Sequence, residues 1–188
     1  MTALTCALKE WAIAVEALLQ GELILLLRKG GIRETGGKFQ VQCDRVALFP
    51  TVEHQKSDWL KPAYQGQVTE STTRPDAIAF AGWAEITEII PVTDPAIVAH
   101  LTPFHIWTEA WAAERLAWKP KQPLLALLLR AHRFATPHTV EYQPHFGGCR
   151  SWLDLAPPLD ATGSEAVLSD RAYGERVAAI RAILSSAD

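Results

Sequence analysis

The sequence lacks the cysteine pattern of a small secreted domain. Its 188 residues include only Cys6, Cys43 and Cys149, an odd number with wide spacing and no CxxC pair. Domains that depend on disulfides carry more cysteines at regular spacings, so we expect reduced thiols and a cytoplasmic location. The first residues place Lys9 and Glu10 among apolar side chains, which does not match the uninterrupted apolar stretch of a signal peptide.

Long apolar runs and an excess of charge of one sign are also missing. The longest apolar runs, residues 23–27 and 124–129, are too short to cross a bilayer, so we expect no membrane association. With 48% hydrophobic and 21% charged residues, the chain has the composition of a globular protein rather than a disordered one. The formal net charge of −3 gives no global case for nucleic-acid binding, although a local basic face remains possible.

Sequence motifs for cofactors and metals are absent. The Gly37-Lys38 pair has Ile32 where a Walker A loop needs glycine, and Phe39 where it needs serine or threonine. Three histidines and Cys149 form a loose series over residues 132–149, without the tight pairs that zinc sites use. Neither the GxSxG elbow nor the kinase motifs occur. We therefore expect no metal site and assign no cofactor.

Periodicity and turn residues predict an α+β fold in one domain. Apolar residues at three- and four-residue spacing predict a helix over residues 4–20, and Asp94 before Pro95 is typical of a helix start. The predicted strands are 23–27, 39–41, 46–49, 77–92 with a bend at Gly82, 124–129, 140–142 and 151–155. The other predicted helices are 95–101, 108–118 and 169–184, residues 51–60 are a short helix or ordered loop, and loops cover 61–75 and 156–168.

These elements predict a central, mostly antiparallel sheet or a partly open β-barrel. Its flanking helices would be the N-terminal helix, the tryptophan-bearing central helix and the C-terminal helix. The core would extend over about residues 4–155, before the loop and the last helix.

Basic and aromatic residues gather in two stretches. Residues 28–45 and 115–133 each contain five lysines or arginines, the second stretch has no carboxylate, and each stretch adjoins or contains a predicted strand. If those strands are neighbours, their basic ends can form one patch close to several tryptophans. Charge for phosphates and rings for bases are what RNA or another single strand needs. The predicted phosphate contacts are Arg28, Lys29, Arg33, Arg45, Arg115 and Lys119, with Trp107 or Trp118 stacking a base.

Two other function classes stay open. An enzyme acting on a nucleotide or nucleic acid would draw its acid, base and charge from Glu53, His54, Lys56 and His105. That alternative requires His54 to meet a second polar group in a pocket. A regulatory protein that binds a protein partner without chemistry would instead show an exposed apolar patch on the C-terminal helix.

Several long motifs resemble a known bacterial family. They lie in residues 7–11, 25–34, 49–55, 103–108, 115–120 and 123–130, and together they cover about residues 4–134. They are similar to DUF1802, a domain of unknown function well represented in cyanobacteria, and this likeness implies one unit without implying any activity. The strand ending in Leu27-Arg28-Lys29-Gly30 and the later strand at Gly82-Trp83 also resemble small PUA-like β-barrels, which often bind RNA or modified bases.

Overall fold

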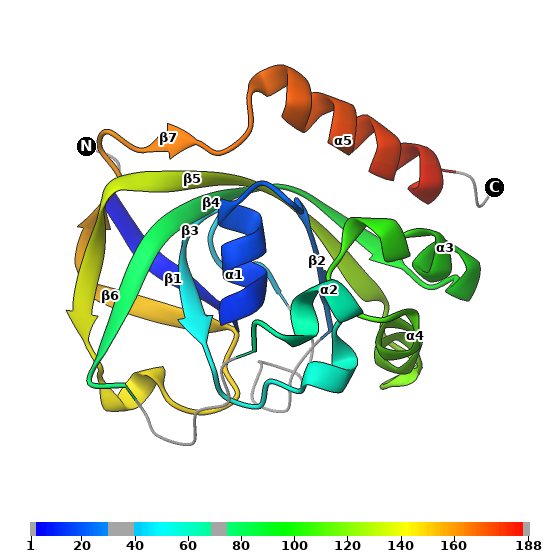
Figure 1. Ribbon diagram of the computed structural model, residues 1–188, viewed down its shortest axis with the longest axis horizontal. Coiled ribbons are helices and arrows are strands. Elements are labelled where there is room, and N and C mark those ends of the chain that lie inside the picture. Colours follow the sequence, from blue (N-terminus) through cyan, green and yellow to red (C-terminus); the bar gives the residue numbers. More distant parts are fainter. Residues whose placement is uncertain (1–2, 30–39, 69–74, 186–188) are drawn as a thin grey trace.

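The computed structural model describes residues 3–29, 40–68 and 75–185, which form one curved sheet with helices around it (Figure 1). The strands are β1 Ala3–Trp11, β2 Leu25–Arg28, β3 Arg45–Thr51, β4 Ala77–Val92, β5 Leu124–Glu141, β6 Trp152–Asp160 and β7 Glu165–Ala166. The helices are α1 Ala12–Leu19, α2 Pro62–Gln65, α3 Pro95–His100, α4 Glu109–Ala117 and α5 Asp170–Leu184. Single 3-10 turns lie at Ser57–Trp59, Thr102–Phe104 and Pro144–Phe146.

The sheet is mostly antiparallel and open, as the sequence predicts. Its strand order is β2-β5-β4-β3-β1-β6, and β7 pairs with β5. Only β1 and β3 run parallel among these pairs. The long strands β4 and β5 carry most of the curvature, and the sheet curls around α1 (Figure 1). A register shift between Phe80 and Gly82 confirms the predicted bend in β4.

The N-terminal segment corrects one prediction, because residues 3–11 form a strand and only Ala12–Leu19 is helical. In β1, Cys6 and Leu8 join one apolar cluster while Leu4 and Ala7 join another, so both faces of the strand are buried. A bulge between Leu4 and Cys6 shifts the alternation by one residue. A strand buried on both faces has no polar face, and the shift gives its apolar positions a helix-like spacing.

Two predicted loops also differ from the structure. Residues 156–160 continue β6 through Pro157 and Pro158, which is possible because β6 lies at the edge of the sheet, where a strand tolerates missing N–H donors. Residues 62–65 form α2 inside the predicted loop 61–75. The predicted strand 39–41 is not found: Phe39 lies outside the described residues, and Gln40 and Val41 are not in a strand.

Helix α5 packs on the outside of the sheet, over β4 and β5 (Figure 1). Its buried side chains are Tyr173, Val177 and Ile180, and the Tyr173 hydroxyl lies 2.6 Å from Thr87 Oγ1. The apolar stripe of α5 therefore faces the sheet. The exposed apolar patch that would mark a protein-binding surface is not seen on the described part of this helix.

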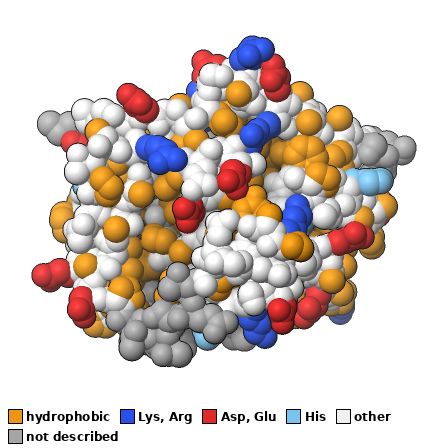
Figure 2. All heavy atoms as spheres, viewed as in Figure 1, with side chains coloured by type: hydrophobic (Ala, Val, Ile, Leu, Met, Phe, Trp, Pro, Cys, Tyr) orange, Lys and Arg blue, Asp and Glu red, His pale blue; other side chains and the backbone are white. Residues whose placement is uncertain are grey.

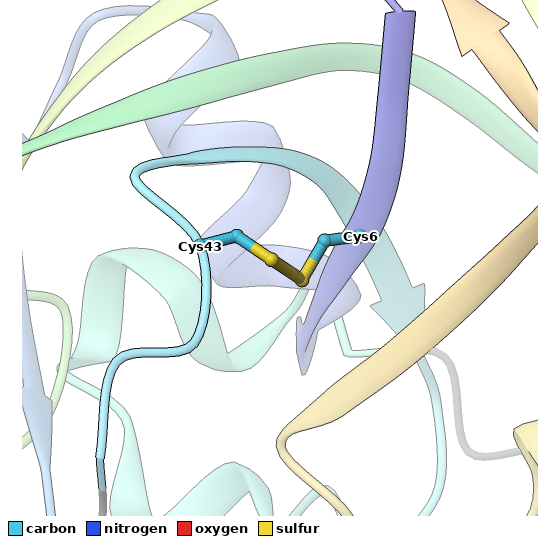
Figure 3. The surroundings of a disulfide bond; sticks show 2 residues. All are labelled: Cys6 and Cys43. Carbon is cyan, nitrogen blue, oxygen red and sulfur yellow. A yellow bond between two sulfur atoms is a disulfide. The ribbon is translucent and has the colours of Figure 1, made fainter.

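A disulfide joins Cys6 of β1 to Cys43, which lies just before β3 (Figure 3). The prediction of reduced thiols is therefore wrong for these two residues, while Cys149 is free and exposed. Parallel pairing of β1 with β3 brings the two cysteines together although they are 37 positions apart in the sequence. Spacing in the sequence could not show this proximity. Over the described ranges, no helix has both the length and the apolar character needed to cross a membrane.

Candidate nucleic-acid interface

The two basic stretches of the sequence meet at one end of the sheet. Strands β2 and β5 are antiparallel neighbours, with Arg28 opposite Leu125. Lys29 Nζ donates a hydrogen bond to the carbonyl oxygen of Leu116 in α4. The antiparallel register therefore places the end of β2 beside the connection from α4 to β5, whereas Arg130 lies further along β5 and pairs with Asp170 of α5.

The charges of Arg28 and Lys29 are directed toward the protein itself. Arg28 Nη1 donates to Glu10 Oε2 at 2.7 Å, and Arg28 Nη2 donates to Ser151 Oγ at 2.6 Å. Lys29 is only 4% exposed, and burial, with a smaller effect from Arg115, lowers the pKa of its amine. The Lys29 amine is therefore enclosed by the protein, and the phosphate contact predicted for Lys29 stays a prediction that would require this side chain to leave its buried position.

A hollow of about 460 Å³ lies beside this junction. Its lining residues are Trp59, Trp111, Glu114, Arg115, Ala117 and Trp118. Most of these come from α4, and Trp59 comes from the 3-10 turn Ser57–Trp59. The turn is held against the start of α4 because Thr108 N donates to Trp59 O at 2.9 Å and Leu60 forms a β-bridge with Trp107. Backbone hydrogen bonds thus fix Trp59 close to the helix.

Two tryptophan pairs support the walls of the hollow. Trp107 stacks on Trp111 with 4.7 Å between ring centroids, and Trp11 stacks on Trp59 at 5.9 Å with nearly parallel planes. Trp107 is 2% exposed. Its ring lies in the core against Trp111, so the base-stacking role predicted for Trp107 stays a prediction that would require this ring to leave the core. Trp118 is half-buried and lines the hollow.

Cations cover the ring of Trp118. The Arg115 guanidinium lies 5.1 Å from its centroid and 5.8 Å from that of Trp111, while Lys119 Nζ lies 4.5 Å from the Trp118 ring. Helix α4 ends at Ala117, Trp118 is its C-cap in an extended conformation, and Lys119 follows with a positive φ of 51°. This left-handed backbone conformation is unfavourable for any residue with a Cβ. The strained turn places the lysine over the tryptophan that precedes it.

The same arrangement recurs across the hollow, where Lys56 Nζ lies 4.5 Å from the Trp59 centroid. Lys56 and Trp59 have the same three-residue spacing as Arg115 and Trp118. Trp59 is not among the residues predicted to bind, although this repeated pattern of a basic residue three positions before a tryptophan is a usable signal in the sequence. The described surroundings of the hollow thus combine the cations of Lys56, Arg115 and Lys119 with the carboxylate of Glu114.

The remaining predicted nucleic-acid contacts lie elsewhere. Arg45 is exposed at the start of β3, where its guanidinium lies 5.8 Å from the Trp83 centroid, and it does not line the hollow. Arg33 lies outside the described residues. On the face shown in Figure 2, basic and acidic side chains are interspersed, so this face carries no broad patch of one charge among the residues drawn in colour.

The predicted acid–base residues do not form one constellation. His54 is exposed, and no hydrogen bond or ion pair joins it to another described residue. Lys9 donates to Glu53 Oε2 at 2.7 Å, and Lys56 lies over Trp59. His105 is 3% exposed, and burial, with a smaller effect from Lys61, lowers its pKa to about 4. The condition set for His54, a polar partner in a pocket, is not met by the described residues.

A second hollow, of about 420 Å³, lies between α3 and α4. Its lining includes Val98, Ala113, Leu116 and Pro120, with Glu109 as its one charged residue. This hollow lacks tryptophans and basic groups among its lining residues. It therefore offers apolar contact without the chemistry of the tryptophan-lined hollow.

The chain is similar in structure to three crystal structures from Zymomonas mobilis, each of which covers 92% of it. ASCH from this organism is 12% identical with a TM-score of 0.45, covering 92% of this chain and 93% of that chain. A serine-to-alanine variant of ZmASCH is 11% identical with the same TM-score, covering 92% and 94%. Because both scores lie below 0.5, these similarities assign neither ligand nor activity here. No curated protein matches the chain.

The comparison with protein families gives a clear result. The sequence model of the Domain of unknown function (DUF1802) matches residues 7–179, which include the second half of β1, the tryptophan-lined hollow and most of α5. This range covers nearly the whole chain and extends the resemblance seen in the sequence motifs. The protein therefore belongs to the DUF1802 family.

Proposed function

We propose that the protein is a nucleic-acid-binding module that holds single-stranded RNA in the tryptophan-lined hollow. The observation that carries the proposal is the group formed by Trp118 with Arg115 and Lys119, which puts two cations within 5.1 Å of one half-buried indole ring. Indole rings stack on any base, and basic side chains neutralise phosphates. Lys56 and Trp59 supply a second pair of the same kind.

The shape of the hollow favours a single strand over a duplex. Trp59, Trp111 and Trp118 are side-chain walls of one local depression, and a base must leave its stack to present a face to them. In a duplex both faces of each internal base are already covered by neighbouring bases. The hollow therefore fits splayed bases of a loop or a single strand.

The charge balance favours an anionic ligand over a cationic one. Clustered indoles are also the walls of sites for methylated ammonium groups, which bind by cation–π attraction. Here Lys56, Arg115 and Lys119 outnumber the Glu114 carboxylate around the hollow. A cationic ligand would meet like charges, whereas a nucleotide combines a flat ring with negative charge.

A cytoplasmic location, where RNA is abundant, belongs to the same proposal. The disulfide between Cys6 and Cys43 makes it testable, because cytosolic thiol systems keep most cysteines reduced. Thiols trapped by alkylation at the moment of lysis show which state the protein holds in cells. A fully formed disulfide in every copy would contradict a reducing cytoplasmic location.

The first experiment is a fluorescence-anisotropy titration of labelled single-stranded RNA and DNA pools at low and moderate salt. We expect binding that weakens with salt, because phosphate contacts release counterions. Trp118→Ala should weaken binding by about tenfold or more, since one base–aromatic stack contributes roughly 1–3 kcal/mol. Exposed Lys121, outside the hollow, provides the matched control as Lys121→Ala. No binding at low salt would reject the proposed function.

A further inference from the structure

The cations in the hollow lie over the same indole rings that a base would occupy. Lys119 Nζ and Lys56 Nζ each lie 4.5 Å from an indole centroid, over Trp118 and Trp59 respectively. A stacked base occupies the space within roughly 3.5–4 Å of a ring face, so a base and an ammonium group cannot cover one patch of ring together. Stacking therefore requires the cation to move.

Trp59 shows the constraint most clearly. Trp11 lies parallel to it, with an interplanar angle of 2° and a centroid distance of 5.9 Å, so part of its ring surface is already packed. The Lys56 ammonium lies over the same ring. Lys56 is exposed, and its four-carbon stem can swing away without any backbone movement. A mobile cation thus covers ring surface that a base could use.

We propose that the hollow recognises nucleotides by exchange, a mechanism that rests on the proposed function. The base of the bound nucleotide displaces a lysine from an indole ring, and the released ammonium pairs with a phosphate of the same strand. The ligand class is single strands that carry both bases and phosphates. Polyanions without bases and nucleosides without phosphate are poor ligands of this site.

The exchange follows from the contact that is lost when a ligand carries only a base or only phosphates. A nucleoside that stacks on Trp59 removes a cation–π contact and offers the displaced lysine no anion in return. A polyphosphate draws the lysine away and leaves the indole face with no partner except water. A nucleotide supplies both replacements at once. Tight binding should therefore require a base and a phosphate in the same molecule.

Competition against a labelled single-stranded RNA tests the ligand class. The unlabelled competitors are the same RNA, a strand of equal length without bases, inorganic polyphosphate and free nucleosides, matched in phosphate or base concentration. We expect the abasic strand and the polyphosphate to compete at least tenfold more weakly than the RNA. If polyphosphate competes as well as RNA, the exchange is wrong while RNA binding stands. If the RNA itself does not bind, the proposed function fails first.

The substitution Lys56→Ala tests the exchange at one ring. It uncovers Trp59 and removes the phosphate partner, so strand binding should weaken with a salt slope smaller by about one. Nucleoside binding should instead improve by about threefold or more, because no cation–π contact has to be given up. Lys121→Ala is the control of equal chemistry outside the hollow. Nucleoside affinity that stays unchanged or falls in Lys56→Ala would overturn the exchange.

Discussion

At the scale of single residues, the hollow depends on Lys119, whose backbone conformation is unfavourable for a residue with a Cβ. Lys119 adopts φ 51° directly after Trp118, the C-cap residue of α4. Glycine is the usual residue at such a position, because a Cβ is strained there. A lysine at this point gives up some stability and places its ammonium over Trp118. Strain of this kind is concentrated at functional sites.

Comparing Lys119→Gly with Lys119→Ala separates this strain from the loss of charge. Both variants remove the ammonium, but only glycine relieves the left-handed conformation. We expect the glycine variant to exceed the alanine variant by about 1 kcal/mol in unfolding free energy, measured by urea denaturation. Both should lose strand affinity. Equal stability of the two variants would show that φ at this position is not strained in solution.

Buried His105 gives a prediction for pH. Its pKa in the folded protein is about 4, below the roughly 6.5 of an unfolded chain. Above pH 6.5 the His105 imidazole is neutral in both the folded and the unfolded protein, so its burial does not make the free energy of unfolding depend on pH there. As the pH falls toward 4, His105 becomes protonated in the unfolded chain while it stays mostly neutral in the folded protein. The free energy of unfolding therefore falls by up to about 3 kcal/mol.

The substitution His105→Phe should remove this part of the pH dependence. Urea denaturation of both proteins between pH 7.5 and 4.5 gives the difference in slope directly. His100→Gln, at an exposed position of α3, serves as the control and should keep the wild-type profile. An unchanged slope in His105→Phe would place the acid sensitivity in other groups.

At the scale of elements, the bend of β4 depends on glycine. A Cβ at Gly82 would lie far inside van der Waals contact of the His132 carbonyl oxygen and of Leu19 Cδ2. These atoms belong to β5 and α1, so the close approach joins the sheet to the helix that it encloses. We expect Gly82→Ala to lower the unfolding free energy by about 3 kcal/mol or more.

Replacing Gly174 of α5 by alanine is the matched substitution, for which we expect the unfolding free energy to change in the opposite direction. A Cβ there would meet nothing within 4 Å, and glycine inside a helix costs backbone entropy. Gly174→Ala should therefore stabilise the protein by about 0.5–1 kcal/mol in the same denaturation experiment. Loss of stability in this variant would mean that α5 packs differently in solution.

At the scale of the whole molecule, the disulfide closes the chain from β1 to the start of β3. Cys6 and Cys43 are 37 positions apart in the sequence, and the segment between them includes α1 and β2. Chain-entropy arguments give a loop of this length about 4 kcal/mol of stabilisation. We expect a reducing agent to lower the melting temperature clearly, with Cys149→Ser behaving like wild type. Identical melting with and without reductant would contradict a disulfide in the native protein.

The sequence by itself determined much of the element order. Asp94 before Pro95 marks the start of α3, the stripe of Val177 and Ile180 marks α5, and Gly82 marks the bend in β4. Each of these signals is local, because capping, helix periodicity and glycine geometry act within a few residues. The basic residues and the tryptophan spacing around α4 were likewise visible in the sequence.

Only the tertiary structure decided which of those residues lie together at the hollow. Trp107 and Trp118 look alike in the sequence, yet packing buries the first and leaves the second at the hollow. Strand β1 and the partner of Cys6 were misread for the same reason. Burial on both faces, strand register and the approach of Trp59 to α4 depend on contacts between distant segments, and local spacing carries no record of them.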